Sequence, residues 1–226
     1  MDNNVEMITE AIMEALKSRK IAGSGQTCTS GCRADLGEME VPVGISNHHV
    51  HLSQQDLETC FGKGHQLESI KDLTQPGQFA CKETVTLCGP KGALEKIRVL
   101  GPVRKESQVE LLASDNFKLG IKAPLRLSGD LDGSAGVTVV GPCGSVFLKQ
   151  GAIIAKRHIH MLPEDAARYG VTDGQMVSIE VPGDRGGVYG NVMVRVTDTS
   201  ALDCHIDTEE ANAMGLGSCT KLKMVI

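Results

Sequence analysis

One short phrase occurs twice in this chain, and its repetition constrains the fold more than any other feature. His49-Val50-His51 and His158-Ile159-His160 lie 109 residues apart, and the similarity continues on both sides of the histidines, where residues 47–52 align with residues 156–161. A similar phrase repeated at such a spacing is typical of a chain that contains two copies of one structural unit. At 226 residues the chain is long enough for two domains of roughly 100 residues each.

The spacing of the histidines predicts strands that lead into helices. In a strand, residues i and i+2 point to the same face, so both histidines of each phrase share one face. The first phrase runs into Ser53, which is expected to cap a helix that ends near Gly62, and the second runs into Pro163, at an expected first helical turn. His205 precedes a third such junction, because Asp207 and Glu210 have the spacing of a helix cap and its third residue.

Composition narrows the class of protein. The chain has 26 glycines, four phenylalanines, two tyrosines and no tryptophan, so we expect a turn-rich protein with an aliphatic core. A net charge of −5 with mixed signs argues against nucleic-acid binding as the main activity. We find neither an apolar run of transmembrane length nor a secretory signal, so we expect no membrane association. For the same reason we expect the eight cysteines to stay reduced in the cytoplasm.

A second repeat has a different offset. Residues 85–92 resemble residues 137–144, each a short apolar run that ends in a Gly-Pro turn, but these two segments lie only 52 residues apart. Two offsets in one chain indicate related halves whose elements follow a permuted order. The sequence therefore predicts a mainly β fold with short α-helices, built as two similar, interlocked β-barrels related by a permuted internal duplication.

The expected domain organisation has four parts. Residues 1–21 contain an amphipathic helix over 5–19, and residues 22–40 have the composition of a flexible linker. The barrels are expected over 41–126 and 127–226, with strand exchange between them. The N-terminal helix either folds back, docks on another protein or is a loosely packed terminus, and an exposed apolar face would favour homo-oligomers.

The histidines predict metal binding. Of seven in the chain, five stand at strand-to-helix junctions, a distribution that scattered structural histidines would not produce. Zinc is the leading candidate because imidazole suits it, although cobalt, nickel, manganese and iron stay open. Five histidines exceed one catalytic site, so we expect two ions, with Glu110 or another carboxylate completing a ligand shell. The expected histidine ligands are His49, His51, His158, His160 and His205.

Two further segments are candidates for substrate contacts. A Gly-Pro turn presents Arg104 and Lys105 between two strands, and an arginine fork near metal ions is a good receptor for phosphate, although a solvated turn charge is the alternative. Ser128 begins a glycine-rich loop that could approach a ligand or could connect the domains. His48 has the opposite strand parity to its neighbours and is excluded from the ligand set, and His65 is expected to be solvated.

Taken together, these segments resemble the PduL-type phosphate propanoyltransferases, the phosphotransacylases of bacterial microcompartments. The resemblance runs from about residue 41 to residue 213 and depends on VPVGISNHHVHLS, RVLGPVRKESQVEL, APLRLSGDLDGSAGV, KRHIHMLPEDA and HIDTEEANA. It implies two β-barrel domains, a dinuclear zinc site, and conversion of an acyl-CoA and phosphate to an acyl phosphate and coenzyme A. It also implies an N-terminal peptide, here residues 5–19, that targets the enzyme to a shell protein of a microcompartment, for example one for propanediol degradation.

The resemblance assigns roles to individual residues. The two histidine pairs and His205 become the metal ligands, Glu110 an additional ligand or a carboxylate beside them, Arg104 the residue that holds phosphate, and Ser128 a site residue. The implied mechanism is direct transfer of a propanoyl or acetyl group to phosphate, without a nucleophilic serine or cysteine. Cys143 is the one thiol that deserves a check. His48 departs from the family pattern, in which arginine is expected.

Two other functions compete with acyl transfer. A dinuclear metallohydrolase would use water in place of phosphate to cleave a thioester or phosphoester. A structural metal-binding module would instead surround every ion with four protein ligands and leave no open position. The sequence does not identify the walls of an acyl pocket, so it predicts no acyl-chain length.

Overall fold

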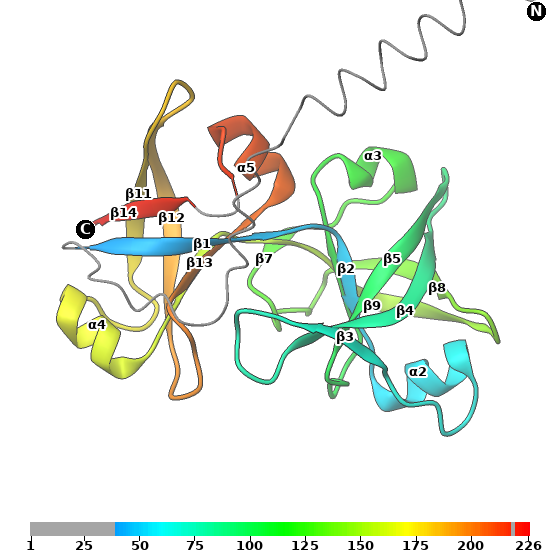
Figure 1. Ribbon diagram of the computed structural model, residues 1–226. Coiled ribbons are helices and arrows are strands. Elements are labelled where there is room, and N and C mark those ends of the chain that lie inside the picture. Colours follow the sequence, from blue (N-terminus) through cyan, green and yellow to red (C-terminus); the bar gives the residue numbers. More distant parts are fainter. Residues whose placement is uncertain (1–38, 218–219) are drawn as a thin grey trace, which may run out of the picture. The chain divides into compact units, whose positions relative to one another are not determined.

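The computed structural model describes residues 39–217 and 220–226, and strands dominate them (Figure 1). The expected N-terminal helix, and all of the expected linker except residues 39 and 40, lie outside these ranges. The described helices are short: α2 (Gln54–Phe61), α3 (Asp115–Leu119), α4 (Pro163–Tyr169) and α5 (Thr208–Met214). None of them is long and apolar enough to cross a membrane. The prediction of a mainly β fold with short helices is confirmed.

Six strands form a closed barrel that carries the second histidine pair, and we call it the HIH barrel. Its pairing order is β1-β13-β10-β12-β11-β14. The bounds are β1 (Glu40–Ser46), β10 (His158–Met161), β11 (Met176–Val181), β12 (Gly187–Val196), β13 (Asp203–Asp207) and β14 (Lys221–Val225).

The other strands form the HVH barrel, which carries the first pair. The ring β4-β5-β2-β6-β9-β8 closes because β8 pairs with both β4 and β9. Two further strands pair at its margin, β3 with β4 and β7 with β9. The bounds are β2 (His49–His51), β3 (Ser69–Asp72), β4 (Phe79–Cys88), β5 (Ala93–Gly101), β6 (Gln108–Leu111), β7 (Leu125–Arg126), β8 (Ala135–Val140) and β9 (Ser145–Ala155).

The two barrels repeat one pattern of strand pairing. In the HVH barrel, β2 lies between a parallel neighbour, β5, and an antiparallel one, β6. In the HIH barrel, β10 likewise lies between parallel β12 and antiparallel β13. The pattern extends one strand further, because β9 runs parallel to β6 and β1 runs parallel to β13. These matched strands confirm the expected duplication into two similar barrels.

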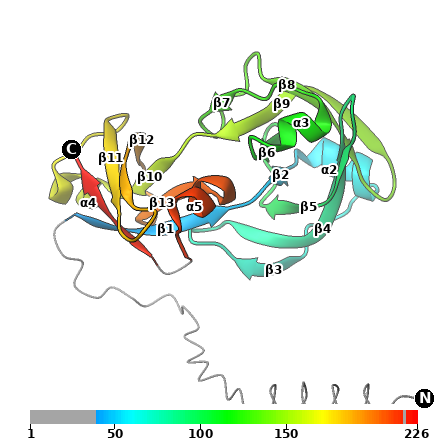
Figure 2. The ribbon, with the colours of Figure 1, turned by 90° about the horizontal axis from the view of Figure 1, so that it is seen from above.

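The duplication is permuted by exchange of one strand. β1 pairs in the HIH barrel but leads along the chain into β2 of the HVH barrel, and β9 pairs in the HVH barrel but leads into β10 (Figures 1 and 2). The first strand of the HIH barrel, β1, therefore corresponds to the last strand of the HVH barrel, β9. The HVH barrel takes its strands from one contiguous segment, residues 49–155, which extends past the expected division between residues 126 and 127, whereas the HIH barrel combines β1 with strands from residues 158–225.

The repeat with the 52-residue offset has a local cause. Its two segments form the β4–β5 and β8–β9 hairpins of the same barrel, where Gly89 N–H donates to the Gly92 carbonyl and Gly141 N–H to the Gly144 carbonyl, both at 2.9 Å. A Cβ on Gly89 would collide with the backbone of α3, and one on Gly141 with the backbone of α2. Close packing of each turn against a helix end explains why both carry glycine at the same place.

Each barrel has its own aliphatic core. Val50 and Ile159, the residues between the paired histidines, are fully buried in these cores. Because side chains alternate along a strand, both histidines of each pair face away from their barrel core. The helices begin where the sequence predicts: Ser53 caps α2 by accepting Asp56 N–H, and Asp207 caps α5 by accepting Glu210 N–H.

Candidate active site

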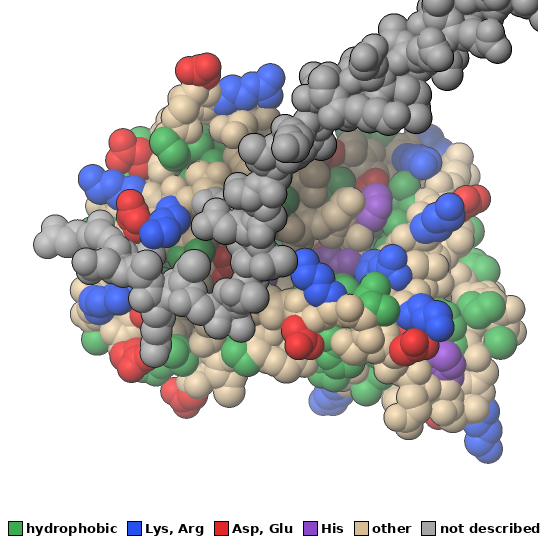
Figure 3. Space-filling view, in the orientation of Figure 1, with side chains coloured by type: hydrophobic (Ala, Val, Ile, Leu, Met, Phe, Trp, Pro, Cys, Tyr) green, Lys and Arg blue, Asp and Glu red, His purple; other side chains and the backbone are tan. Residues whose placement is uncertain are grey.

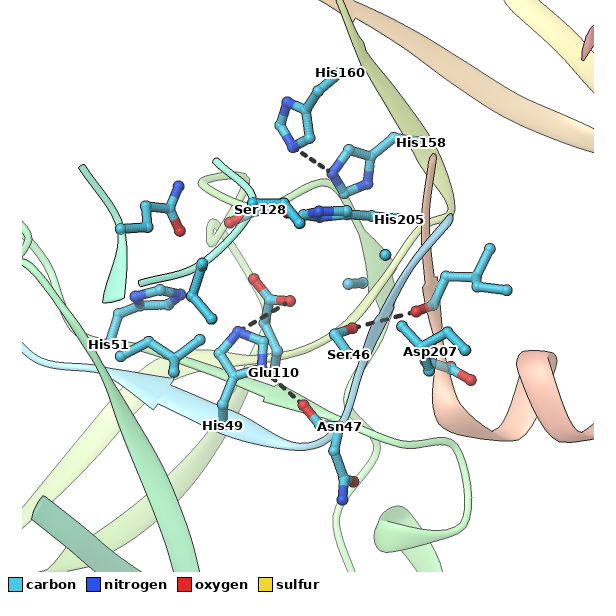
Figure 4. Close-up of a pocket in the computed structure, with 18 of the residues that line it drawn as sticks. Ser46, Asn47, His49, His51, Glu110, Ser128, His158, His160, His205 and Asp207 are labelled. Carbon is cyan, nitrogen blue, oxygen red and sulfur yellow. Dashed lines mark hydrogen bonds and ion pairs between the residues drawn. The ribbon is translucent and has the colours of Figure 1, made fainter. Parts of the chain in front are cut away.

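A cavity of about 680 Å³ is lined by residues of both barrels. All the histidines of the predicted ligand set line it, and Figure 4 shows their side chains converging with Glu110 and Ser128. On the face drawn in Figure 3, histidine side chains lie in a hollow with lysine or arginine side chains beside them. The predicted site residues that line this cavity are His49, His51, Arg104, Glu110, Ser128, His158, His160 and His205.

His49, His51 and Glu110 form the cluster of the HVH barrel. One ligand atom from each lies within 4.8 Å of the others. Glu110 stands directly opposite His49 in the antiparallel pairing of β2 and β6, and its Oε2 lies 3.4 Å from His49 Nε2. The structure therefore places the carboxylate predicted from sequence beside the first histidine pair.

His158, His160 and His205 form the cluster of the HIH barrel, again with ligand atoms within 4.8 Å of one another. His205 stands opposite His158 in the antiparallel pairing of β10 and β13, the place that Glu110 takes in the other barrel. The Nε2 atoms of His158 and His160 are 3.0 Å apart (Figure 4). Each cluster thus combines a histidine pair with a third ligand from the antiparallel neighbour.

Hydrogen bonds orient the first histidine of each pair in the same way. His49 Nδ1 lies 2.8 Å from the Asn47 carbonyl, and His158 Nδ1 lies 2.8 Å from the Lys156 carbonyl. Because a carbonyl only accepts, Nδ1 carries the hydrogen in both rings, and the lone pair of Nε2 faces the cluster. The first histidine of each pair therefore presents the same nitrogen, Nε2, to its cluster.

A metal ion fits both clusters. In the part of the chain that the structure describes, His51 Nδ1 is the buried side-chain nitrogen or oxygen that has no hydrogen-bond partner. Two ligand atoms on one tetrahedral zinc ion lie about 3.3–3.5 Å apart, given Zn–N and Zn–O bonds of about 2.0–2.2 Å. The 3.0 Å between the Nε2 atoms of His158 and His160 and the 3.4 Å between His49 Nε2 and Glu110 Oε2 therefore suit a shared ion. Two histidines with a carboxylate, or three histidines, are also ligand sets of catalytic zinc sites.

Burial keeps His51, His158 and His160 neutral. Together with neighbouring arginine and histidine side chains, it lowers the pKa of His51 to about 3, of His160 to about 3 and of His158 to about 4. Neutral imidazole is the form that binds metal. Burial raises the pKa of Glu110, whereas His49, His51 and Arg104 lower it, and the balance is a pKa of about 2. His51, His158, His160 and Glu110 are thus in their ligating protonation states at neutral pH.

These shifts predict that the metal-free protein loses stability in mild acid. The folded-state pKa values of the three histidines lie below the ordinary 6.5, so below that pH the unfolded chain binds protons that the folded chain does not. Each such imidazole contributes up to about 1.4 kcal/mol per pH unit within its window. Urea unfolding of the metal-free protein should show stability falling from about pH 6.5 toward pH 4. His51→Gln should flatten this slope, and an unchanged slope would contradict the assignment.

Arg104 is held in place rather than solvated. Its backbone N–H donates to the Leu52 carbonyl at 2.9 Å, and its Nη1 donates to Ser128 Oγ at 3.1 Å. Burial lowers the pKa of the guanidinium, and Glu110 partly opposes this effect. Lys105, the other basic residue of the turn, is exposed and is absent from the cavity lining.

The sequence interpretation missed four basic residues of the cavity. They are Lys71, Arg98, Lys156 and Arg195. A signal for Arg195 exists, because it stands between Val194 and Val196 in an apolar alternation that sends it to the face opposite the core. The pairing of β10 and β12 then sets it beside His160.

His48 bonds an acidic side chain, as the equivalent residue of the other barrel does. Its Nδ1 lies 3.0 Å from Asp115 Oδ2 at the start of α3, and Arg157, the matching residue before the second pair, lies 2.8 Å from Glu210 Oε1 in α5. Each residue therefore bonds an acid in the first turn of a helix. The expectation for His65 was wrong: it is partly buried, stacks on Phe61 and bonds Glu83 at 2.8 Å.

The described cysteines offer no nucleophile to this cavity, since none of them lines it. Cys143 is exposed in the β8–β9 turn, where its N–H donates to the Cys60 carbonyl. Burial raises the pKa of Cys81 to about 11 and of Cys204 to about 12, so both stay thiols at neutral pH.

Two clusters that could hold metal ions line one cavity together with Arg104. A family model described as phosphate propanoyltransferase matches residues 42–217. A phosphate propanoyltransferase of Rhodobacter capsulatus is 58% identical over 176 residues, 78% of this chain and 82% of the relative. One from Thermotoga maritima is 54% identical over 182 residues, 80% and 87% of the two chains. One from Rhodopseudomonas palustris is 50% identical over 216 residues, 96% and 95% of the two chains.

The chain belongs to the phosphate propanoyltransferase family, and it is an acyltransferase. The match over residues 42–217 covers both histidine pairs, Arg104 and His205.

Proposed function

We propose that the chain interconverts an acyl-CoA and phosphate with an acyl phosphate and coenzyme A, with propanoyl-CoA or acetyl-CoA as the acyl donor. The observation that carries the proposal is the convergence of both histidine clusters and Arg104 on one cavity. Its basic lining suits two anionic substrates, because phosphate and coenzyme A both carry phosphoryl charge.

We assign the two clusters to two metal ions, with zinc as the leading candidate. His49, His51 and Glu110 would hold one ion, and His158, His160 and His205 the other. Three protein ligands leave a position open for substrate, as catalytic zinc sites require. When bound, such ions act as Lewis acids that stabilise negative charge on a carbonyl oxygen, a phosphate oxygen or a departing thiolate.

Arg104 is assigned to hold phosphate. A guanidinium offers two parallel N–H donors to an oxyanion, and the hydrogen bond from Arg104 Nη1 to Ser128 Oγ fixes its direction before substrate arrives. A phosphate oxygen then forms a bond to the carbonyl carbon of the thioester, the C–S bond breaks, and sulfur leaves as a thiolate. No acyl-enzyme is needed, which agrees with a cavity that no described cysteine lines.

Phosphate dependence is the test of this reaction. We expect thiol release from propanoyl-CoA to require phosphate and to yield propanoyl phosphate in equal amount, because phosphate is the nucleophile. The measurement combines a thiol reagent with trapping of acyl phosphate by hydroxylamine. Thiol release at the same rate without phosphate would instead identify a thioester hydrolase, the competing function for such a metal site.

The N-terminal segment is proposed to place the enzyme inside a bacterial microcompartment of the cytoplasm by docking on a shell protein. The support is the amphipathic pattern of residues 5–19 together with the similarity to the Rhodopseudomonas palustris relative, which extends over 96% of this chain. Deleting residues 1–24 should leave catalysis intact and abolish co-localisation with the shell. Co-localisation that survives the deletion would refute this role.

A further inference from the structure

One buried polar residue precedes the third ligand of each cluster by two positions. Gln108 stands before Glu110 and is 1% exposed, and Asp203 stands before His205 and is 2% exposed. The strand pairings set Gln108 opposite His51 and Asp203 opposite His160, so the two residues occupy equivalent places in the two barrels. Neither has a role in the reaction proposed above, and burying a polar group costs free energy unless it is well bonded.

Each of these residues bonds the ligand that follows it. Gln108 Nε2 donates to Glu110 Oε1 at 2.6 Å, and Asp203 Oδ2 lies 2.9 Å from His205 Nε2. The chemistry of the pairs is complementary, since an amide donor faces a carboxylate and a carboxylate acceptor faces an imidazole N–H. The residue type changes between the barrels together with the ligand, which points to one function in two chemical forms.

Gln108 is itself fixed by the loop that follows β7. Its Oε1 accepts Gly129 N–H at 2.8 Å, and its second Nε2 hydrogen goes to Ser128 Oγ at 2.8 Å. The same Ser128 hydroxyl accepts from Arg104. Gln108 therefore connects the position of the Glu110 carboxylate to that of the arginine.

Asp203 is fixed by the other barrel. Thr74, in the loop between β3 and β4, donates its hydroxyl to Asp203 Oδ2 at 2.6 Å. Gln75, the residue after Thr74, is 5% exposed, donates to the Ala201 carbonyl at 2.9 Å and accepts Ala201 N–H at 3.1 Å. Two adjacent residues of the HVH barrel thus bond the chain just before the third ligand of the HIH cluster.

Gly44 leaves the space that this arrangement needs. It pairs with His205 in the parallel pairing of β1 and β13. A Cβ on Gly44 would lie 2.5 Å from Asp203 Oδ2 and 2.7 Å from His205 Cδ2, too close for any side chain. The carboxylate and the imidazole therefore lie against bare backbone on one side and against Thr74 on the other.

We infer that Asp203 is the positioning residue of the HIH cluster, and that it keeps the hydrogen of His205 on Nε2 and presents Nδ1 to the metal ion. Gln108 is its counterpart, which holds Glu110 Oε1 and leaves Oε2 toward His49. A carboxylate behind a ligating imidazole fixes the tautomer and raises the basicity of the ligand. The inference rests on the proposed metal site, and it makes His205 ligate through a different nitrogen from His158.

The first test uses the full-length, metal-free wild-type protein. Nitrogen-15 NMR at a pH where imidazole is neutral distinguishes the two tautomers of each histidine. The expected result is a hydrogen on Nε2 of His205 and on Nδ1 of His158. A hydrogen on Nδ1 of His205 would overturn the inference, whatever the protein does with metal.

The second test measures zinc affinity by competition with a chromophoric chelator. Asp203→Asn should weaken one of two bound ions by about 10–100-fold and leave the other unchanged. Thr74→Val should weaken the same ion less, and Gln108→Leu should weaken the other ion. Asp198→Asn, which removes an exposed carboxylate from the loop before β13, is the matched control and should change neither affinity.

The outcomes separate this inference from the metal assignment itself. If wild-type protein binds no zinc, the proposed metal site fails, while the NMR result still decides the tautomer. If wild type binds two ions and Asp203→Asn binds both with wild-type affinity, the positioning role is wrong and the metal site stands. Thermal unfolding of each metal-free variant shows whether a loss of affinity comes from the ligand geometry or from an unfolded barrel.

Discussion

Replacing Arg104 by alanine is expected to lower kcat/KM for phosphate by roughly 10²–10³-fold, the cost of removing one fixed donor for developing negative charge. The guanidinium is already directed by Ser128 and shielded from water, so its attraction for phosphate exceeds that of a solvated side chain. The measurement is the rate of thiol release from propanoyl-CoA over a range of phosphate concentrations.

Two variants of the same turn make this prediction specific. Lys105→Ala removes an exposed charge beside Arg104 and should leave kcat/KM unchanged, which excludes a general loss of electrostatic attraction. Arg104→Lys keeps the charge but loses the two-pronged contact, so it should recover only part of the activity. Unchanged kinetics for phosphate in a folded Arg104→Ala protein would remove this residue from the mechanism.

The candidate site was predictable because its ligands obey short-range rules. Strand alternation places His49 and His51 on one face, and the buried Val50 between them shows which face belongs to the core. The duplicated phrase then implies a second site of the same form. Because the period of a strand is two residues, the ligand pairs needed no knowledge of long-range packing.

Short-range rules could not place the third ligand of each cluster. Glu110 and His205 reach their clusters because β6 and β13 pair antiparallel with the histidine strands, and register is set by the whole barrel. The Asp203–Thr74 contact also joins residues 129 positions apart, which no local pattern indicates. Arg195 was readable from alternation alone, and so was Arg98, which stands between the buried residues Ile97 and Val99 and is set beside His49 by the pairing of β2 and β5.

Strand exchange is the fold feature that the sequence indicated for a partly mistaken reason. The 52-residue offset suggested permutation, yet its two segments are hairpin turns of one barrel that pack on helix ends. The permutation is real and has another origin, since β1 and β9 each pair in the barrel that the following strand does not join. Chain order alone could not distinguish a permuted duplication from a repeated hairpin within one barrel, because both produce similar segments at unequal spacing.

Substituting both His158 and His160 by glutamine is expected to remove one of two bound metal ions and to lower kcat by about 10³-fold or more, since Lewis-acid stabilisation contributes several kcal/mol to such reactions. The third member, His205, cannot hold an ion alone. Metal analysis of the purified protein gives the stoichiometry, and thiol release from propanoyl-CoA gives the rate. The corresponding double variant of His49 and His51 should remove the other ion.

A histidine outside both clusters provides the matched control. His65→Gln removes an imidazole that bonds Glu83 away from the cavity, so metal content and kcat should stay at their wild-type values. The double variants also decide between catalytic and structural metal. A protein that loses one ion, keeps its thermal stability and loses its activity uses that ion in the reaction. A protein that loses the ion together with its fold uses it to hold the barrels, and full activity with one ion missing would contradict the two-metal mechanism.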